Sequence, residues 1–332
     1  MNPTKAGGIF SRLKVDKYLL LIISMVVVAS FLPARGAAAV GFGWATKGAI
    51  GLVFFLHGAR LSREAVIGGL THWKLHLLVL AATFGLFPLL CLGMTVLPAW
   101  ITPPALAGGI MFLGCLPSTI QSSIGFTVIA RGNIAAAVAA ASASNLLGIV
   151  ITPILVGLLL HAQGSISVGS AWAIVLQLLA PFVGGQLLRR WIGSWVSMHG
   201  RQVQLIDRGS ILLVVYTAFS SAVVGGVWSQ LGPLDLVRLL IVCAALLALM
   251  LGATFLAARA LDFARTDEIA IVFCGSKKSL ASGVPMAGVL FAPATAGLAL
   301  LPLMVFHQLQ LMACAIIAQR YANRADLDAM SG

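Results

Sequence analysis

Residues 271–285 read IVFCGSKKSLASGVP, and this stretch places two adjacent cations inside an apolar run that is broken by glycines. Lys277 and Lys278 lie far from any part of the sequence that has the composition of a surface loop. The polar and helix-breaking residues around them predict an interruption in a long apolar helix. What such an interruption means depends on the rest of the chain.

The composition of the chain indicates that it resides in a lipid bilayer. Of its 332 residues, 60% are hydrophobic and only 9% are charged, and the mean hydropathy is +1.03. Soluble domains have roughly 25% charged residues, so this chain cannot cover a soluble surface with polar groups. The net charge of +12 does not predict nucleic acid as a partner, because the lysines and arginines separate apolar runs and form no basic patch.

The apolar runs predict about ten membrane-spanning helices, because a spanning helix needs about 20 predominantly apolar residues. The predicted spans are 17–34, 44–61, 73–98, 104–130, 133–161, 169–189, 208–229, 233–261, 267–292 and 295–319. The expected fold class is therefore an all-α polytopic membrane protein. The sequence gives no prediction of its oligomeric state.

The positive charges between the spans support this count. Sixteen of the 21 lysines and arginines fall on one side of the membrane, and only Arg35, Lys47 and Arg238 fall on the other. The remaining two are Lys277 and Lys278. Since positive charge accumulates in cytoplasmic loops, both termini are expected in the cytoplasm of a multi-pass protein of the bacterial inner (plasma) membrane.

Ten spans divide into two sets of five, and because five is odd the second set enters the membrane from the opposite side. This is the arrangement of an inverted repeat, which is common among secondary transporters. The predicted organisation is a cytoplasmic N-terminal segment (1–16), a first five-helix repeat (17–161), a second five-helix repeat (169–319) and a cytoplasmic C-terminal tail (320–332).

Predicted spans four and nine occupy equivalent places in the two halves, and each contains helix-breaking residues. Span four includes GCLPSTIQSSIGFTVIARGN and span nine includes FCGSKKSLASGVP. Broken helices survive in a membrane around a site or a wet cavity, because lipid cannot satisfy the freed backbone groups. A plain kink, with hydroxyls bonded back to the helix, is the alternative for span four alone. The candidate residues of a substrate or ion site at this crossing are Ser118, Thr119, Gln121, Ser122, Ser123, Ser276, Lys277, Lys278 and Ser279.

Other polar residues inside the spans are candidates for lining a cavity. They are Asn145, His307 and Gln310, of which the last two are three residues apart and share one helix face. Hydrogen bonding between helices is the alternative role. No nucleophile–base pair, zinc-ligand spacing or phosphate loop is present, so we expect neither enzymatic activity nor a cofactor. An intramembrane enzyme with a lysine base is less favoured, because no carboxylate partner lies within the spans.

Four motifs give the chain a family resemblance. They are FFLHGARLS (54–62), GCLPSTIQSS (114–123), ARGNIAAAVAAASASNLLGIVITP (130–153) and FCGSKKSLASGVPMAGVLF (273–291). Together with the ten-span plan they resemble the bile acid:sodium symporter superfamily, and within it the branch of sodium/bile acid cotransporter 7-like proteins, over about residues 15 to 320.

The resemblance implies a panel domain (segments 1, 2, 6 and 7) beside a core domain (segments 3, 4, 5, 8, 9 and 10), with the substrate between them. It implies a secondary active transporter that moves an organic anion by alternating access. The branch also leaves open a non-transporting regulator of membrane ion homeostasis or of glycoconjugate handling.

Sodium-coupled members of the superfamily bind two sodium ions behind the crossing, and the resemblance maps their ligands onto this chain. The ligands fall on Ser122 and Ser123, on Thr83 (also a candidate for lining the cavity), on Ala137 and Ala141, and on Phe273 and Lys277, with Lys278 following. Phe273 stands where the family has a glutamate, and Lys277 stands where it has a glutamine. A lysine ammonium 4 Å from a sodium ion would repel it by about 4 kcal/mol, so family-type sodium coupling is doubtful.

These replacements suggest that Lys277 or Lys278 takes the place of a sodium ion as a fixed cation. The sequence favours Lys277 for this role and leaves Lys278 open, with reception of an anionic substrate as the other possibility. A buried lysine can also exchange a proton, so Na⁺ and H⁺ both stay open as coupling ions. Alternatively, a span beginning at Ser279 would leave both lysines in a cytoplasmic loop with Asp267 and Glu268.

Overall fold

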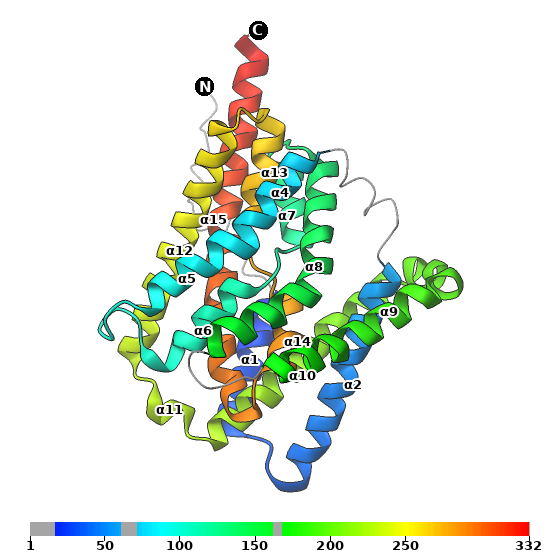
Figure 1. Cartoon of the computed structure of the whole chain (residues 1–332), viewed down its shortest axis with the longest axis vertical. Coiled ribbons are helices and arrows are strands. Elements are labelled where there is room, and N and C mark those ends of the chain that lie inside the picture. The colour runs from blue at the N-terminus through cyan, green and yellow to red at the C-terminus, as the bar shows by residue number, and fades with distance from the viewer. Residues whose placement is uncertain (1–16, 61–71, 162–167, 332) are drawn as a thin grey trace, which may run out of the picture.

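The computed structural model describes residues 17–60, 72–161 and 168–331, and within these ranges all regular structure is helical (Figure 1). The fold class of an all-helical membrane protein is therefore confirmed. The predicted N-terminal segment, 1–16, lies outside the described residues.

Each of the ten predicted spans falls on one helix or on consecutive helices. The first half contains α1 (Lys17–Phe31), α2 (Gly36–Arg60), α4 (Trp73–Ala81), the π-helical turn η3 (Ala82–Leu86), α5 (Phe87–Thr95), α6 (Pro104–Cys115), α7 (Gln121–Ile129) and α8 (Ile134–His161). The second half contains α9 (Val168–Met198), α10 (Gly200–Val224), α11 (Val227–Gln230), α12 (Pro233–Ala260), α13 (Arg265–Gly275), α14 (Leu280–Leu290) and α15 (Pro293–Ser331).

Several helices extend past the apolar runs that predicted them. α2 and α10 begin before the predicted starts at 44 and 208, and α9 and α15 end after the predicted ends at 189 and 319. An apolar run marks the part of a helix that fits the hydrocarbon layer, and helical hydrogen bonding continues in more polar surroundings. The predicted tail after 319 is thus a direct continuation of α15.

Six helical stretches in the described part of the chain are long and apolar enough to cross a membrane. They are Gly36–Arg60, Trp73–Thr95, Ile134–Leu160, Gly200–Val224, Pro233–Ala260 and Pro293–Arg324. The two predicted broken helices are confirmed as broken: α6 is followed by α7, and α13 by α14. None of these four helices crosses the hydrocarbon layer alone, because 12 residues of helix span about 18 Å and the layer is about 30 Å thick.

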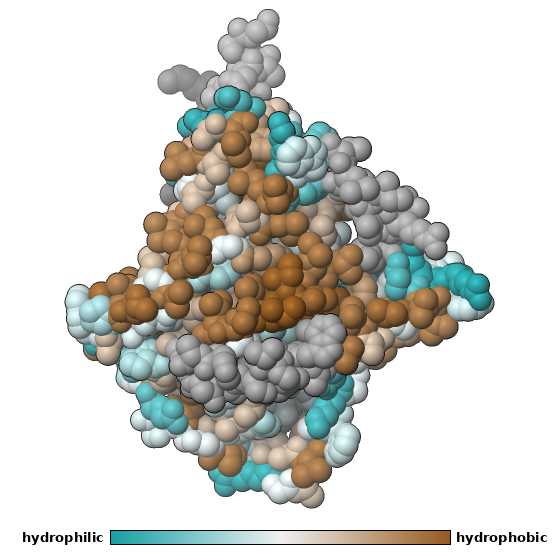
Figure 2. All heavy atoms as spheres, in the orientation of Figure 1, coloured by the Kyte–Doolittle hydropathy of each residue, from teal (hydrophilic) through white to brown (hydrophobic). Residues whose placement is uncertain are grey.

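The surface agrees with residence in a bilayer. Figure 2 shows hydrophobic residues across the middle of the visible face and hydrophilic residues towards its upper and lower ends. The large exposed side chains include Leu187, Trp191 and Leu256, which are 70%, 59% and 65% exposed. In water such a surface would drive aggregation, whereas in lipid it is the expected outer layer.

The most extensive helix–helix contact joins α2 to α9, and two glycines allow the helices to approach this closely. A Cβ atom on Gly185 would lie 1.9 Å from the carbonyl oxygen of Phe55, and one on Gly58 would lie 2.0 Å from that of Phe182. The two backbones therefore touch directly, as small residues permit in membrane proteins. In Figure 1 this helix pair diverges from the group formed by α4–α8 and α12–α15.

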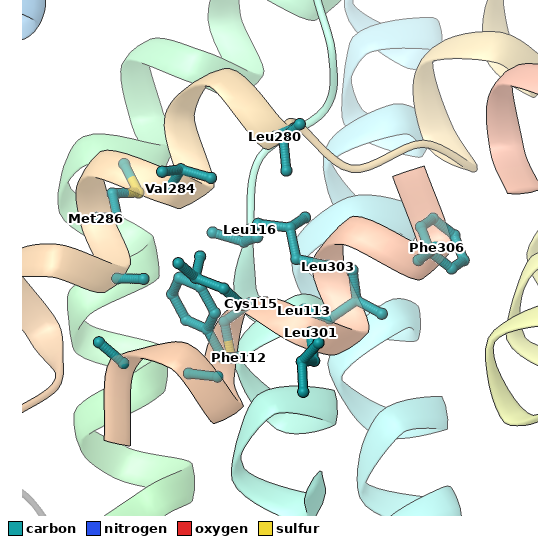
Figure 3. Close-up of a cluster of buried hydrophobic side chains, with 14 of the residues drawn as sticks. Phe112, Leu113, Cys115, Leu116, Leu280, Val284, Met286, Leu301, Leu303 and Phe306 are labelled. Carbon is teal, nitrogen blue, oxygen red and sulfur yellow. The ribbon is translucent and has the colours of Figure 1, made fainter. Parts of the chain in front are cut away.

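The core of that larger group lies beside the first helix break. Figure 3 shows Leu116, Leu280 and Leu303 close to one another, with Phe112 and Phe306 nearby. A Cβ atom on Gly283 would lie 2.6 Å from side-chain carbons of both Leu116 and Leu303, so the glycine allows α14 to approach this close. All five cysteines are free and buried.

Candidate functional site

The two helix breaks meet and are hydrogen-bonded to each other. Leu116, before Pro117, adopts the extended conformation (ψ 154°) that proline favours in the preceding residue and that ends α6. The Ser279 N–H then donates to the Pro117 carbonyl (2.9 Å), and the Ser118 hydroxyl donates to the Cys274 carbonyl (2.5 Å). The expected crossing of the two broken segments is therefore present in the structure.

Helix α8 supplies side chains that satisfy the freed backbone. The Ser118 N–H donates to the Ser144 hydroxyl (3.0 Å), and the Asn145 amide donates to the Ser118 carbonyl (2.7 Å). The Asn145 carbonyl oxygen also accepts from the Ser282 hydroxyl on α14 (2.7 Å). Because Asn145 bonds to both broken segments, its contacts are those of interhelical hydrogen bonding.

The ammonium group of Lys278 is enclosed by three backbone carbonyls. It donates to the carbonyl oxygens of Thr83 (2.8 Å), Gly114 (2.6 Å) and Leu116 (2.7 Å). An ammonium has three N–H donors, so every donor has a partner. The residue is 0% exposed, and the ring of Phe87 lies with its centroid 4.2 Å from Nζ.

The local backbone explains why these three carbonyls are available. In the π-helical turn the Phe87 N–H bonds to the Ala82 carbonyl, and the next residue, Pro88, has no N–H to offer the carbonyl of Thr83. The other two carbonyls come from the end of α6, where the last carbonyls of a helix lack intrahelical donors. Two helix irregularities thus create one cation-binding site, and the lysine fills it.

A side chain of α15 holds the backbone of the same lysine. The Gln310 amide oxygen accepts from the Lys278 N–H (2.8 Å), and its nitrogen donates to the Lys278 carbonyl (2.9 Å). That nitrogen also lies 2.8 Å from Nδ1 of His307. Gln310 is 0% exposed, so its amide replaces helical hydrogen bonds that the second break removes.

Lys277 is equally buried, at 0% exposed, but its ammonium is poorly bound. Its one hydrogen bond, to the Ser122 hydroxyl, is 3.5 Å long. The rings of Phe126 and Phe273 have their centroids 4.5 and 5.4 Å from Nζ. Within the described ranges no carboxylate forms an ion pair with it. The contacts therefore favour Lys278 as the fixed cation, the reverse of the sequence-based expectation.

The remaining predicted site residues gather around the same crossing, with one exception. In the first break, the Thr119 hydroxyl lies 2.7 Å from that of Ser122 and 2.8 Å from that of Ser123. The Ser123 hydroxyl reaches the second break and donates to the Phe273 carbonyl. The others bond within their own segments: Ser276 donates to the Val272 carbonyl, Ser279 caps α14 by accepting from the Ser282 N–H, and the Thr83 hydroxyl donates to the Val79 carbonyl. Gln121 is exposed.

The alternative that placed both lysines in a cytoplasmic loop is wrong, because both are fully buried. Asp267 and Glu268 lie instead in the first turn of α13, at the end remote from the break. There Glu268 accepts hydrogen bonds from Arg259 (3.0 Å) and from the Tyr321 hydroxyl (2.7 Å). These contacts tie α12, α13 and α15 together.

Comparison with known proteins identifies the family. Residues 16–323 match the family model described as the SBF-like CPA transporter family. The chain belongs to this family. It is 55% identical over 317 residues to protein PA2026 of Pseudomonas aeruginosa, covering 95% of each chain. It is 50% identical over 317 residues to the "putative symporter YfeH" of Escherichia coli, covering 94% of each chain.

A more distant relative of this SBF-like chain carries the name that the motifs suggested. Sodium/bile acid cotransporter 7 of Rattus norvegicus is 29% identical over 278 residues, which cover 81% of this chain and 80% of the relative. The resemblance stated from the sequence is therefore confirmed. The chain is a multi-pass membrane protein of a transporter family.

The residues of this SBF-like chain do not fit the sodium sites that the resemblance implies. Ala137, Ala141 and Phe273 are each 0% exposed, and the two alanines pack in an apolar cluster with Ile271 and Cys274. None of these side chains offers the oxygen that sodium requires. The carbonyls freed by the helix irregularities are bound by the ammonium of Lys278 instead.

Sequence reasoning missed several groups that build this site. They are Ser144, Thr152, whose hydroxyl donates to the Cys115 carbonyl (2.7 Å), and the π-helical turn at Ala82–Leu86. A signal existed for the turn, because Pro88 stands five residues after Thr83 and cannot serve its carbonyl. Ser144 directly precedes Asn145, and as a polar residue within the same predicted span it could have been chosen by the same reasoning.

Proposed function

We propose that the protein is a secondary active transporter that moves an organic anion by alternating access. Its family membership and the names of its relatives support transport of a solute. The bonded pair of helix breaks supports a site at the crossing, because transporters form their sites from discontinuous helices. The proposed location is the bacterial inner membrane, with both termini in the cytoplasm, as the bias of positive charge favours.

The proposed architecture has ten spans in two inverted five-helix repeats, 17–161 and 169–319. The equivalent places of α6–α7 and α13–α14 support it. The proposed panel domain is α1, α2, α9 and α10, and the proposed core is formed by α4–α8 and α12–α15. The extensive contact of α2 with α9 supports the first group, and α10, which contacts both α1 and α15 extensively, lies at the border between the two groups.

The poorly bound ammonium of Lys277 carries the proposal of an anionic substrate. A buried cation with one 3.5 Å hydrogen bond gains much from an anion, because charge-assisted hydrogen bonds are about twice as strong as neutral ones. Ser122, whose hydroxyl contacts this ammonium, is itself partly exposed, so the cation lies one side chain away from an accessible surface. We assign reception of the anion to Lys277.

Lys278, in this proposal, replaces a sodium ion of the family. It supplies positive charge to three carbonyls that would otherwise be unsatisfied. Because the side chains that would bind sodium are replaced, a proton is the coupling ion to test first, with sodium as the comparison.

Transport by the full chain in proteoliposomes tests this function. The assay measures uptake of a panel of labelled organic anions under a sodium gradient, a proton gradient or neither. We expect saturable uptake that does not require sodium and that is lost in Lys277→Gln. Strict dependence on sodium would contradict the replacement by lysine.

Other outcomes of this assay favour the alternatives. No uptake of any anion by folded protein would support a non-transporting regulator of ion homeostasis or glycoconjugate handling. Chemical conversion of an anion without its accumulation in the vesicles would support an enzyme.

A further inference from the structure

A second polar site lies away from the crossing, where the end of α2 meets α9. It is a cavity of about 780 Å³, and every residue that lines it belongs to the described part of the chain. Its polar lining includes Arg60, Gln186, Arg189, Arg190 and Ser194. Nothing in the proposed transport mechanism uses these groups.

The cavity carries an excess of positive charge. Arg60 donates to Asp207 across a 2.6 Å ion pair, which neutralises one of the three arginines. Within the ranges that the structure describes, no carboxylate forms an ion pair with Arg189 or Arg190. The guanidinium of Arg190 stacks on the Trp191 ring, with its central carbon 3.6 Å from the ring centroid, and this contact leaves its in-plane N–H donors available. Arg189 and Arg190 can therefore both donate to an anion, and planar sets of N–H donors match phosphate oxygens.

Gln186 and Gly193 complete the lining of the cavity. The amide oxygen of Gln186 is buried and has no hydrogen-bond partner. This oxygen only accepts hydrogen bonds, so the NH₂ group of the same amide is the part of Gln186 that can donate to an anion. Gly193 leaves room for the side chain of Arg189, because a Cβ atom at position 193 would lie 3.1 Å from Cγ of Arg189 and crowd it.

The position of the cavity favours a ligand at the membrane surface. Trp191 and Trp195 are exposed on the same helix, and tryptophan concentrates where a membrane meets water. Figure 2 shows hydrophilic residues beside hydrophobic ones at the right-hand end of the molecule, to the right of the label α9 in Figure 1. Basic pockets between helices at such a level bind anionic lipid headgroups.

We propose that this cavity binds a phosphate group, presented by the headgroup of an anionic phospholipid or by free phosphate. Arg189 and Arg190 supply the charge-assisted hydrogen bonds, and Arg60, oriented by Asp207, closes the side formed by α2. An anion bound here joins α2 to α9 beyond their glycine contact.

The test measures the melting temperature of the full chain in detergent against added ligand. Phosphatidylglycerol, phosphatidylcholine and inorganic phosphate are titrated separately into wild type and into Arg189→Gln/Arg190→Gln. We expect saturable stabilisation of the wild type and at least a tenfold rise in the half-saturating concentration for the variant. Stabilisation by phosphatidylglycerol alone supports a lipid headgroup, and stabilisation by inorganic phosphate as well supports a phosphate site open to soluble anions.

Two further variants keep the result interpretable. Arg320→Gln/Arg324→Gln removes the same charge from exposed positions on α15 and is expected to bind like the wild type. Gly193→Leu fills the cavity without changing its charge and is expected to weaken binding as the arginine pair does. Equal weakening by both arginine pairs, or no saturable stabilisation of the wild type, would overturn the proposal.

Discussion

Lys277 and Lys278 are neighbours in the sequence, but their ammonium groups have different hydrogen-bond partners. Lys278 has three carbonyl partners within 2.8 Å of its ammonium. Lys277 has one hydroxyl at 3.5 Å and two aromatic faces. Both side chains are fully buried, so burial does not distinguish them. The difference supports the proposal that Lys278 completes the structure and that Lys277 receives the substrate.

Replacement of Lys278 by methionine is expected to have the largest effect. It leaves three buried carbonyls without donors, and each such loss costs about 1–3 kcal/mol. We therefore expect a loss of at least about 3 kcal/mol in the free energy of unfolding, or failure to obtain folded protein. Thermal unfolding of purified protein measures this, with Lys47→Met at an exposed position of α2 as control. An unchanged melting temperature would remove the distinction between the two lysines.

Gln310→Leu tests the support of the same lysine from its backbone side. The change leaves the N–H and carbonyl of Lys278 without their amide partner, so we expect a destabilisation of about 2–3 kcal/mol. Gln308 provides a matched control two residues away, because its amide oxygen is buried and has no hydrogen-bond partner. Gln308→Leu should be tolerated or stabilising. Similar losses of unfolding free energy in both variants would contradict this role of Gln310, because they would show that any change of side chain on α15 destabilises the protein.

Lys277→Met is expected to change stability little and transport greatly. It removes one long hydrogen bond and cation–π contacts worth about 0.5–2 kcal/mol, while it also removes an ammonium whose burial opposes folding. The net change in unfolding free energy should stay within about 1 kcal/mol. Unfolding and anion uptake are measured on the same preparation. A destabilisation as large as that of Lys278→Met would contradict the assignment of Lys277 to substrate.

Lys278→Gln probes the smallest predicted effect. A glutamine amide occupies part of the carbonyl site and leaves space for an ion, so sodium should raise the melting temperature of this variant slightly. The wild type and Lys277→Gln should not respond, because their site still holds the ammonium of Lys278. Melting in sodium chloride against choline chloride makes the comparison. A sodium response of the wild type would instead indicate a separate sodium site.

The sequence predicted the crossing but not which lysine completes it. Pro117 and the glycines of the second stretch marked both breaks, because helix-breaking residues act locally. The partners of Lys278 are backbone carbonyls, which every residue has, and only the local geometry makes three of them available. The part played by Thr83 shows this well, since its side chain was the candidate and its carbonyl makes the contact.

The direct contact between α2 and α9 restricts how the molecule can move. Where Gly58 and Gly185 bring two backbones together, no side chain can change rotamer to let one helix slide along the other. The two helices therefore act as one rigid strut. Any rearrangement that exposes the crossing to alternate sides of the membrane therefore has to occur where this strut borders α8, α10 and α14, or within the connections that lead to it.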